Sequence, residues 1–433
     1  MARQPCHGRL TGMPQGRIAK LAAVWRVRPE ERAPVAWAFL YFFCLLASYY
    51  VLRPVRDAMG IAGKVQELPK LFLVTLAVTF VVTPLFTALV SRWSRRRFVP
   101  IANRFFAAQL LVFAWLLHAP NAGAATARVF FVWTSVFNLF SVTIFWAFMA
   151  DVVRREQGVR LFGLIGAGGT LGAMAGSAVT ALLSARLGAS ALLVIAAVLL
   201  EVTVHCVSRL GALFATPTED AAGRDAELGR GGVVAWARAA AASPYLVAIV
   251  GYMLLFSFTS TFVYFEQARI VKAALPTTAL RTELFAKMDL AVNLGSLLLQ
   301  GVLVAPLLRV VGVGAVLVVL PALTLAGCVA LGVHPTLTAV VVFQVARRAC
   351  DYGIAKPARE VLFTVVTREE KYKAKAFIDT FVYRTGDALG AAVFGGAAAL
   401  GPMVLVVSVP ACLVWMGVSF ALGRLRPPVT ASP

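Results

Sequence analysis

Apolar runs long enough to cross a bilayer dominate this sequence. A helix needs about 20 predominantly apolar residues to span the hydrocarbon core. We expect twelve such spans, at residues 34–52, 68–90, 98–117, 127–150, 160–184, 188–209, 245–265, 284–308, 311–332, 335–352, 377–400 and 402–422. Hydrophobic residues make up 60% of the 433 and charged residues only 14%, so lipid must solvate most of the surface. The sequence therefore predicts an all-α, multi-pass membrane protein.

The basic residues predict how these spans are oriented. The net charge is +21, but the Lys and Arg residues are scattered between apolar runs rather than collected in one polar domain, so we expect no nucleic-acid partner. Most of the 41 Lys and Arg residues fall in the segments that are cytoplasmic if the N-terminus is inside. We therefore expect both termini in the cytoplasm. The basic N-tail, residues 1–33, lacks the apolar core and cleavage site of a signal peptide.

The chain divides into two halves of six spans each. A polar segment rich in Asp, Glu, Arg and Gly, residues 211–243, reads as a cytoplasmic linker between the halves at 34–210 and 244–422, with a C-tail at 423–433. Two short matches repeat in the same order in both halves: Val152–Gln157 with Val365–Glu370, and Leu171–Ala173 with Leu389–Ala391. This layout is typical of the major facilitator fold, which places its solute site between the halves.

Cysteines, histidines and glycines give no sign of catalysis. The six cysteines lie far apart without a CxxC pair and the four histidines are scattered, so we expect buried thiols, no metal and no cofactor. The glycines of the fifth span recur as Gly168, Gly172 and Gly176, a spacing typical of close helix packing rather than of a phosphate-binding loop. No Walker A sequence is present. An enzyme or an ATP-driven motor is therefore not expected.

Charged residues near the end of the first span are the first candidates for a binding site, because charge in an apolar segment is costly. Arg53 and Arg56 are three residues apart and would share a helix face, where they could clamp an anion. Pro54 should break or kink the helix there, and Asp57 follows. The alternative is that both arginines reach to the membrane interface and Asp57 neutralises one of them.

Two further groups lie in the C-terminal half. Lys356, Arg359 and Glu360 follow the tenth span beside Pro357, and anion binding or membrane anchoring fits them equally. For Arg347 and Arg348 just before them, and for Lys371, Lys373 and Lys375 after them, anchoring at the cytoplasmic interface is the favoured interpretation.

The eleventh span and the fourth span add the remaining candidates. Arg384 and Asp387 are three residues apart and can pair along one face, either as a structural ion pair or as solute contacts. Asn138 follows an aromatic stretch, where a base could stack, although packing against neighbouring helices is favoured. Arg104 and Glu201 stand within spans as lone charges.

At these clusters the sequence resembles the ATP/ADP translocases of plastids and obligate intracellular bacteria. The residues that carry the resemblance are Tyr50–Asp57, Phe145–Asp151, Lys356–Glu360 and Lys373–Asp379. The likeness covers residues 34–422 and is closer to the translocase-like proteins of free-living bacteria. It implies a twelve-helix carrier in the bacterial inner membrane that exchanges nucleotides.

The family's functional residues are only partly present. Arg56 and Arg359 stand where nucleotide-exchanging members have lysines, and Arg binds phosphate differently from Lys. Thr134 stands where they have a glutamate in the fourth span, and a second glutamate position falls near Tyr264 and Glu266. The cationic positions therefore keep their charge, while at least one acidic position does not.

Together these features predict a monomeric secondary transporter that moves a nucleotide-like or other phosphorylated or organic anion. Arg53, Arg56 and Arg359 are the expected anion contacts. One alternative is a proton-coupled transporter of another organic anion, with Glu201 or Asp387 as proton sites. Another is a membrane receptor or assembly factor that transports nothing.

Overall fold

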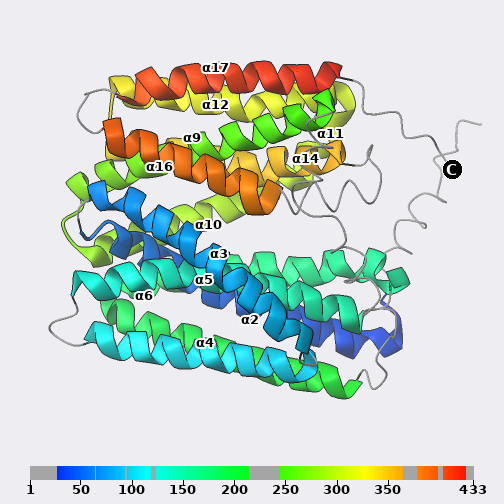
Figure 1. Cartoon of the computed structure of the whole chain (residues 1–433). Helices are drawn as coiled ribbons and strands as arrows, with labels where there is room; N and C mark the ends of the chain where they lie inside the picture. Colours follow the sequence, from blue (N-terminus) through cyan, green and yellow to red (C-terminus); the bar gives the residue numbers. More distant parts are fainter. Residues whose placement is uncertain are drawn as a thin grey trace, which may run out of the picture.

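The computed structural model describes residues 27–63, 65–92, 95–118, 123–153, 155–213, 243–363, 378–397 and 403–425. Every regular element in these segments is a helix (Figure 1). Eight of the described helices are long and apolar enough to cross a membrane, and a ninth such span is a pair bent by 47°. The described part is thus an all-α bundle, and its order of elements is consistent with twelve spans.

The described part of the N-terminal half contains five α-helices, one of which is long enough for two spans. They are α2 (Pro29–Gly60), α3 (Leu68–Arg92), α4 (Arg95–His118), α5 (Ala124–Val152) and α6 (Arg155–Leu213), and a short turn, η1 (Val65–Glu67), precedes α3. The backbone of α6 is broken at Gly188, where φ is +72°, a conformation that glycine adopts without strain. This break matches the boundary predicted between the fifth and sixth spans.

The C-terminal half is less regular. Its elements are α9 (Pro244–Ala274), α10 (Thr278–Val302), α11 (Val304–Val310), α12 (Gly312–Val333), α13 (Leu337–Cys350), η2 (Asp351–Ala355), α14 (Lys356–Leu362), η3 (Ile378–Val382), α16 (Tyr383–Ala397) and α17 (Met403–Arg424). Both η2 and η3 are π-helical. Because α13, η2 and α14 follow one another without a gap, the tenth span extends to Leu362, ten residues beyond its predicted end.

Two proline positions behave differently from one another. Pro54 was expected to break or kink the first span, but α2 continues through it to Gly60. The helix therefore carries both Arg53 and Arg56 on its last turns, rather than beyond its end. Pro357, which has no N–H to donate, is the second residue of α14, one residue after the π-helical turn η2 ends and the helix changes its hydrogen-bond register.

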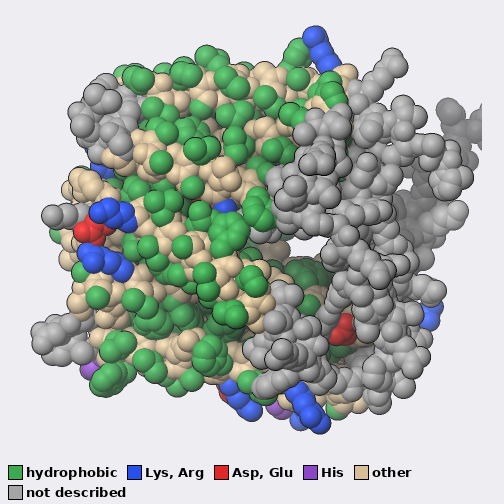
Figure 2. All heavy atoms as spheres, viewed as in Figure 1, with side chains coloured by type: hydrophobic (Ala, Val, Ile, Leu, Met, Phe, Trp, Pro, Cys, Tyr) green, Lys and Arg blue, Asp and Glu red, His purple; other side chains and the backbone are tan. Residues whose placement is uncertain are grey.

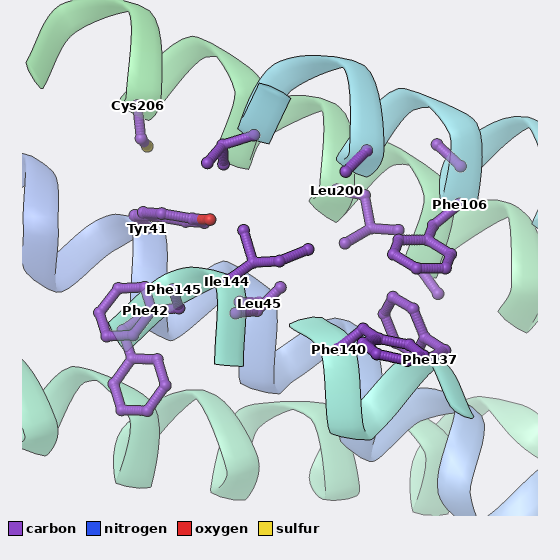
Figure 3. Close-up of a cluster of buried hydrophobic side chains, with 14 of the residues drawn as sticks. Tyr41, Phe42, Leu45, Phe106, Phe137, Phe140, Ile144, Phe145, Leu200 and Cys206 are labelled. Atoms are coloured by element: carbon purple, nitrogen blue, oxygen red, sulfur yellow. The ribbon is translucent and has the colours of Figure 1, made fainter. Parts of the chain in front are cut away.

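Among the described residues, buried side chains form one core in the N-terminal half, a core and a smaller cluster around Phe262 and Phe343 in the C-terminal half, and one cluster shared by both halves. The N-terminal core joins α2, α4, α5 and α6, and Figure 3 shows Tyr41, Phe42, Phe145 and their neighbours interleaved there. The C-terminal core gathers around Trp415, Tyr252 and Phe256. The shared group, which we name the inter-half cluster, comprises Ala58, Ile61, Leu68, Leu71, Phe131, Phe265, Ala268, Val271, Phe285, Met288 and Ala391. The two halves are therefore packed together where α2 ends and α3 begins.

Glycines bring α6 into backbone contact with α2. A Cβ at Gly172 would lie 2.1 Å from the carbonyl oxygen of Phe43, and one at Gly176 would lie 2.3 Å from that of Ala47. Gly168 approaches Phe39 in the same way. The close packing predicted for this glycine stripe is confirmed.

The outer surface fits a lipid environment. Figure 2 shows hydrophobic side chains across the described part of one broad face, with charged side chains gathered at its edges. Large apolar side chains such as Trp115, Leu182 and Val310 are more than 70% exposed, as expected for contact with acyl chains. The predicted solvation by lipid therefore agrees with where the apolar side chains lie.

A candidate solute site between the two halves

A cavity of about 210 Å³ lies between the two halves and is lined by four of the residues predicted from the sequence. Arg56 contributes from α2 and Asn138 from α5, while Arg384 and Asp387 contribute from α16. The rest of the lining is Phe72, Thr75, Leu76, Phe131, Ser135 and Ala388. Phe131 also belongs to the inter-half cluster, so the cavity borders the place where the halves are packed together.

The Arg56 guanidinium is held at the wall of this cavity by its neighbours. Its Nε and Nη2 donate to Asp57 Oδ1 at 3.0 and 2.6 Å, and Nη1 lies 3.4 Å from the Ser135 hydroxyl. The guanidinium also lies over the Phe131 ring, 5.1 Å from its centroid. The Tyr264 hydroxyl of α9 donates to the same Asp57 oxygen at 3.1 Å, so this carboxylate joins the two halves.

Arg384 and Asp387 form the ion pair expected from their spacing, with 3.6 Å between Arg384 Nη1 and Asp387 Oδ2. Asp387 Oδ1 accepts hydrogen bonds from Ser257 and Thr261 of α9 at 2.6 and 2.7 Å. The Arg384 side chain keeps 30% of its surface exposed. Arg384 therefore faces the cavity with a counter-ion at one side, while Asp387 is fixed by hydroxyl groups.

Arg53 lies one turn from Arg56 but contacts a different partner. Asp289 of α10 receives a 2.6 Å hydrogen bond from Arg348 Nη2 of α13, and Arg53 Nη1 lies 3.7 Å from the same oxygen. Asp289 is only 2% exposed, and its Oδ2 has no hydrogen-bond partner among the described residues. One buried carboxylate thus bridges arginines from both halves, and Arg53 does not line the cavity with Arg56.

The arginines in the last part of the tenth span are buried or partly buried, and the interface-anchor interpretation is wrong for Arg347 and Arg348. Arg348 contacts Asp289, as described above. Arg347 is 4% exposed and donates to the Ser260 and Thr324 hydroxyls at 2.6 and 3.2 Å. These contacts could not be predicted from local sequence patterns, because they exist only once helix α13 packs against α9, α10 and α12.

Arg359 also points into the C-terminal half rather than into the cavity. Its Nη2 lies 3.1 Å from Asp351 Oδ1, and its guanidinium lies 4.7 Å from the centroid of Phe256. Lys356 and Glu360, on the same short helix α14, are exposed. The three candidates at this end of the tenth span are therefore not brought together with Arg56 or Arg384.

Aromatic side chains near Asn138 pack on one another. The Trp133 ring is stacked on Phe137 with 5.3 Å between centroids, and its Nε1 donates to Gln109 at 3.0 Å. The favoured expectation of helix packing is confirmed for this stretch. Thr134, at the position of the translocase glutamate, is fully buried and donates to the Phe130 carbonyl at 2.8 Å.

The two charges expected to be lone ones form a pair. Arg104 Nη2 lies 2.9 Å from Glu201 Oε1, and both side chains are more than half exposed on the outside of α4 and α6. Glu201 therefore does not lie on an internal pathway, and of the two proton-site candidates only Asp387 faces the cavity. Glu266, near the other acidic family position, pairs with Arg269.

A second cavity, of about 270 Å³, lies among α2, α3 and α5 next to the inter-half cluster. Its charged lining residues, Glu67 and Arg128, form a 2.6 Å ion pair. Nearby, Lys272 of α9 donates to the Gly63 carbonyl and joins the two halves at this end.

Within the described segments, no group of three or more His, Cys, Asp or Glu residues could hold a metal ion. Cys44, Cys206, Cys328, Cys350 and Cys412 are buried free thiols.

Comparison with solved structures identifies the architecture. A nucleoside transporter, NupG, aligns with 91% of this chain and 98% of its own at 14% identity, with a TM-score of 0.58. A POT family peptide transporter aligns with 92% of this chain and 98% of its own at 12% identity and a TM-score of 0.63. The chain has a major facilitator fold. A bacterial homologue of the human lysosomal transporter Spinster, in an inward-facing and unoccupied conformation, aligns over 92% of this chain and 98% of its own at 14% identity and a TM-score of 0.60.

No protein-family model matches the sequence, and no curated protein matches it. At these identities the solved structures establish the fold alone. The solute must therefore be argued from the cavity itself.

Proposed function

We propose that this protein is a secondary transporter that carries an organic anion through the cavity between its halves. The observation that carries the proposal is the position of Arg56 and Arg384. They reach one cavity from opposite halves of the fold, and each has only one carboxylate partner among the described residues. An anionic group bound between them would contact both halves at once, which is what alternating access requires of a solute.

The rest of the lining suits a solute with both polar and aromatic parts. Thr75, Ser135 and Asn138 supply hydroxyl and amide groups, and Phe72 and Phe131 supply ring faces. The resemblance to ATP/ADP translocases extends the proposal to a phosphorylated, nucleotide-like anion exchanged across a bacterial inner membrane. Because Arg53 and Arg359 are paired away from this cavity, we keep Arg56 as an anion contact and assign Arg384 as the second in place of those two.

Solute counterflow in liposomes tests this proposal. Purified protein reconstituted with trapped ADP should take up labelled ATP, or the organic anion that it prefers, along an opposing gradient. Arg56→Ala and Arg384→Ala should each abolish uptake at equal folded yield. Arg128→Ala is the matched control, because its ion pair with Glu67 lies outside this cavity. The absence of counterflow with any anion in a broad panel would favour a receptor or assembly factor instead.

Asp387 supports a second candidate, proton-coupled transport of an organic anion. It is the carboxylate that lines the cavity, and its Oδ2 is 3.6 Å from Arg384, so protonation would release that arginine. In this case Asp387→Asn should abolish uptake driven by a pH gradient while solute exchange continues. Loss of both activities together would argue for a structural role of Asp387.

A further inference from the structure

An ion pair stands on the outside of the bundle, in a surface whose other large side chains are mostly apolar, with the exposed His205 and Arg209 further along α6. Arg104 of α4 and Glu201 of α6 are joined by hydrogen bonds of 2.9 and 3.2 Å, and their side chains are 63% and 54% exposed. Glu201 lies roughly 18 Å along its helix from the last residue of α6, Leu213, at 1.5 Å per residue. That distance places the pair near the middle of the membrane-spanning part of α6.

Such a pair is not satisfied by lipid alone. A guanidinium has five N–H donors, of which Nε and Nη2 of Arg104 reach Glu201, and 63% of the Arg104 side chain is exposed. The hydrocarbon core offers no acceptor for the other donors, and charged side chains in membrane spans usually face protein or water. The pair therefore indicates that a polar partner covers this surface.

The neighbours of the pair form a continuous face. On α4 and α6 the exposed residues recur at helical spacing and include large apolar side chains: Ile101, Phe105, Leu111, Val112, Trp115, Val194 and Val198. We name this surface, together with Arg104 and Glu201, the α4–α6 face. Its apolar part can pack against another helix pair, and its charged centre can pair with opposite charges.

We propose that the α4–α6 face binds the same face of a second copy of this chain in the membrane. A surface with one arginine beside one glutamate is complementary to itself under two-fold symmetry. Because the two residues already pair within one chain, they lie at the same depth in the membrane. A two-fold axis along the membrane normal therefore brings Arg104 of one copy to Glu201 of the other without any vertical shift. This dimer replaces the monomer expected from the sequence.

The face is separate from the solute cavity, so the dimer does not depend on the proposed transport function. Arg104 and Glu201 lie on α4 and α6, neither of which contributes a residue to that cavity. Changing these residues should therefore leave solute binding unchanged.

Cysteine cross-linking in native membranes gives the first test. Val198→Cys lies next to the pair in the face and is 60% exposed in the wild type, whereas Leu182→Cys lies on the other side of the Gly188 break and is 73% exposed. Both are made in a Cys6→Ser background, since the other five cysteines are buried. Copper phenanthroline should give a cross-linked dimer with Val198→Cys and little or none with Leu182→Cys. Absence of a cross-link at Val198→Cys, or equal cross-linking at both sites, would overturn the proposal.

Charge exchange between copies gives the second test and separates pairing between chains from pairing within one chain. Arg104→Glu alone leaves two acids on the face, and Glu201→Arg alone leaves two arginines, so each variant should lose the Val198→Cys cross-link several-fold. When the two variants are expressed together with different tags, cross-linking between the tags should recover. Inside each chain the like charges still repel one another, so only pairing between chains explains recovery.

Failure of recovery at normal folded yield would contradict the dimer. If either variant does not fold, photobleaching of the fluorescently labelled wild type in liposomes decides the question: two bleaching steps support the proposal and single steps overturn it. A monomer in native mass spectrometry of the wild type would likewise overturn the dimer.

Discussion

Replacing Asp289 by Asn should destabilise the protein far more than the loss of a surface ion pair does. Asp289 is 2% exposed and is the shared carboxylate of Arg53, at 3.7 Å, and Arg348, at 2.6 Å. Asn has the same shape but no charge, so two buried guanidiniums would lose their counter-ion. Removing one partner of a buried ion pair costs about 3–5 kcal/mol. The bridge joins α2 to α10 and α13, so its loss should also loosen the contact between the halves.

A control on the same helix separates burial from charge. Glu283 and Lys287 of α10 pair at 2.5 Å, but the Lys287 side chain is 61% exposed. Exposed pairs with this i,i+4 spacing contribute about 0.3–0.5 kcal/mol. Thermal unfolding of purified protein in detergent should therefore show a large fall in Tm for Asp289→Asn and almost none for Glu283→Gln.

A second substitution tests the cause. In the Asp289→Asn background, Arg348→Met removes one of the uncompensated charges and should recover part of the lost stability, because the two sites are coupled. Equal Tm values for Asp289→Asn and Glu283→Gln would refute the argument that a buried bridge holds the halves together. Additive losses in the double variant would show that the two residues act independently.

Three shorter predictions follow from single contacts. Gly172→Ala should lower the folded yield sharply, because the added carbon would lie 2.1 Å from the Phe43 carbonyl oxygen. Gly163→Ala on the same helix should be tolerated, since no atom lies within 4 Å of the added carbon there. Similar folded yields of the two variants on size-exclusion chromatography would contradict the backbone contact. Tyr264→Phe removes one hydrogen bond to Asp57 and should lower the free energy of unfolding by about 0.5–1.5 kcal/mol, while Arg56 stays paired with Asp57. A loss of stability as large as that of Asp289→Asn would contradict the view that the hydroxyl contributes a single hydrogen bond. The five described cysteines should resist maleimide in the folded protein and react after denaturation; rapid labelling of the native protein would contradict their burial.

Local patterns in the sequence predicted those features that depend on neighbours along one helix. Apolar length indicated the spans, the i,i+3 spacing of Arg384 and Asp387 indicated their pair, and the glycine stripe indicated close packing. Arg56, Asn138, Arg384 and Asp387 were candidates because charge or amide groups inside apolar spans are costly. The structure brings these four together at one cavity.

Contacts between distant helices could not be read in this way. Asp289 lies inside an apolar run, where a charged side chain is as costly as it is at Asp387. The sequence could therefore have indicated Asp289 as a candidate. Its partners could not be inferred, because Arg53 and Arg348 lie on helices far away along the chain. The continuation of α2 past Pro54 was also missed, since neighbouring helices can compensate for the hydrogen bond that proline removes.

The glycine contact between α2 and α6 decides which parts of this molecule can bend. Backbone that touches backbone has no rotamers to rearrange, so α2 and the first part of α6 must move as a single body. Arg56, at the end of α2, is carried by that body. Any conformational change that opens the cavity must then occur elsewhere, at the Gly188 break or across the inter-half cluster. Arg56 moves rigidly with the N-terminal half during that change.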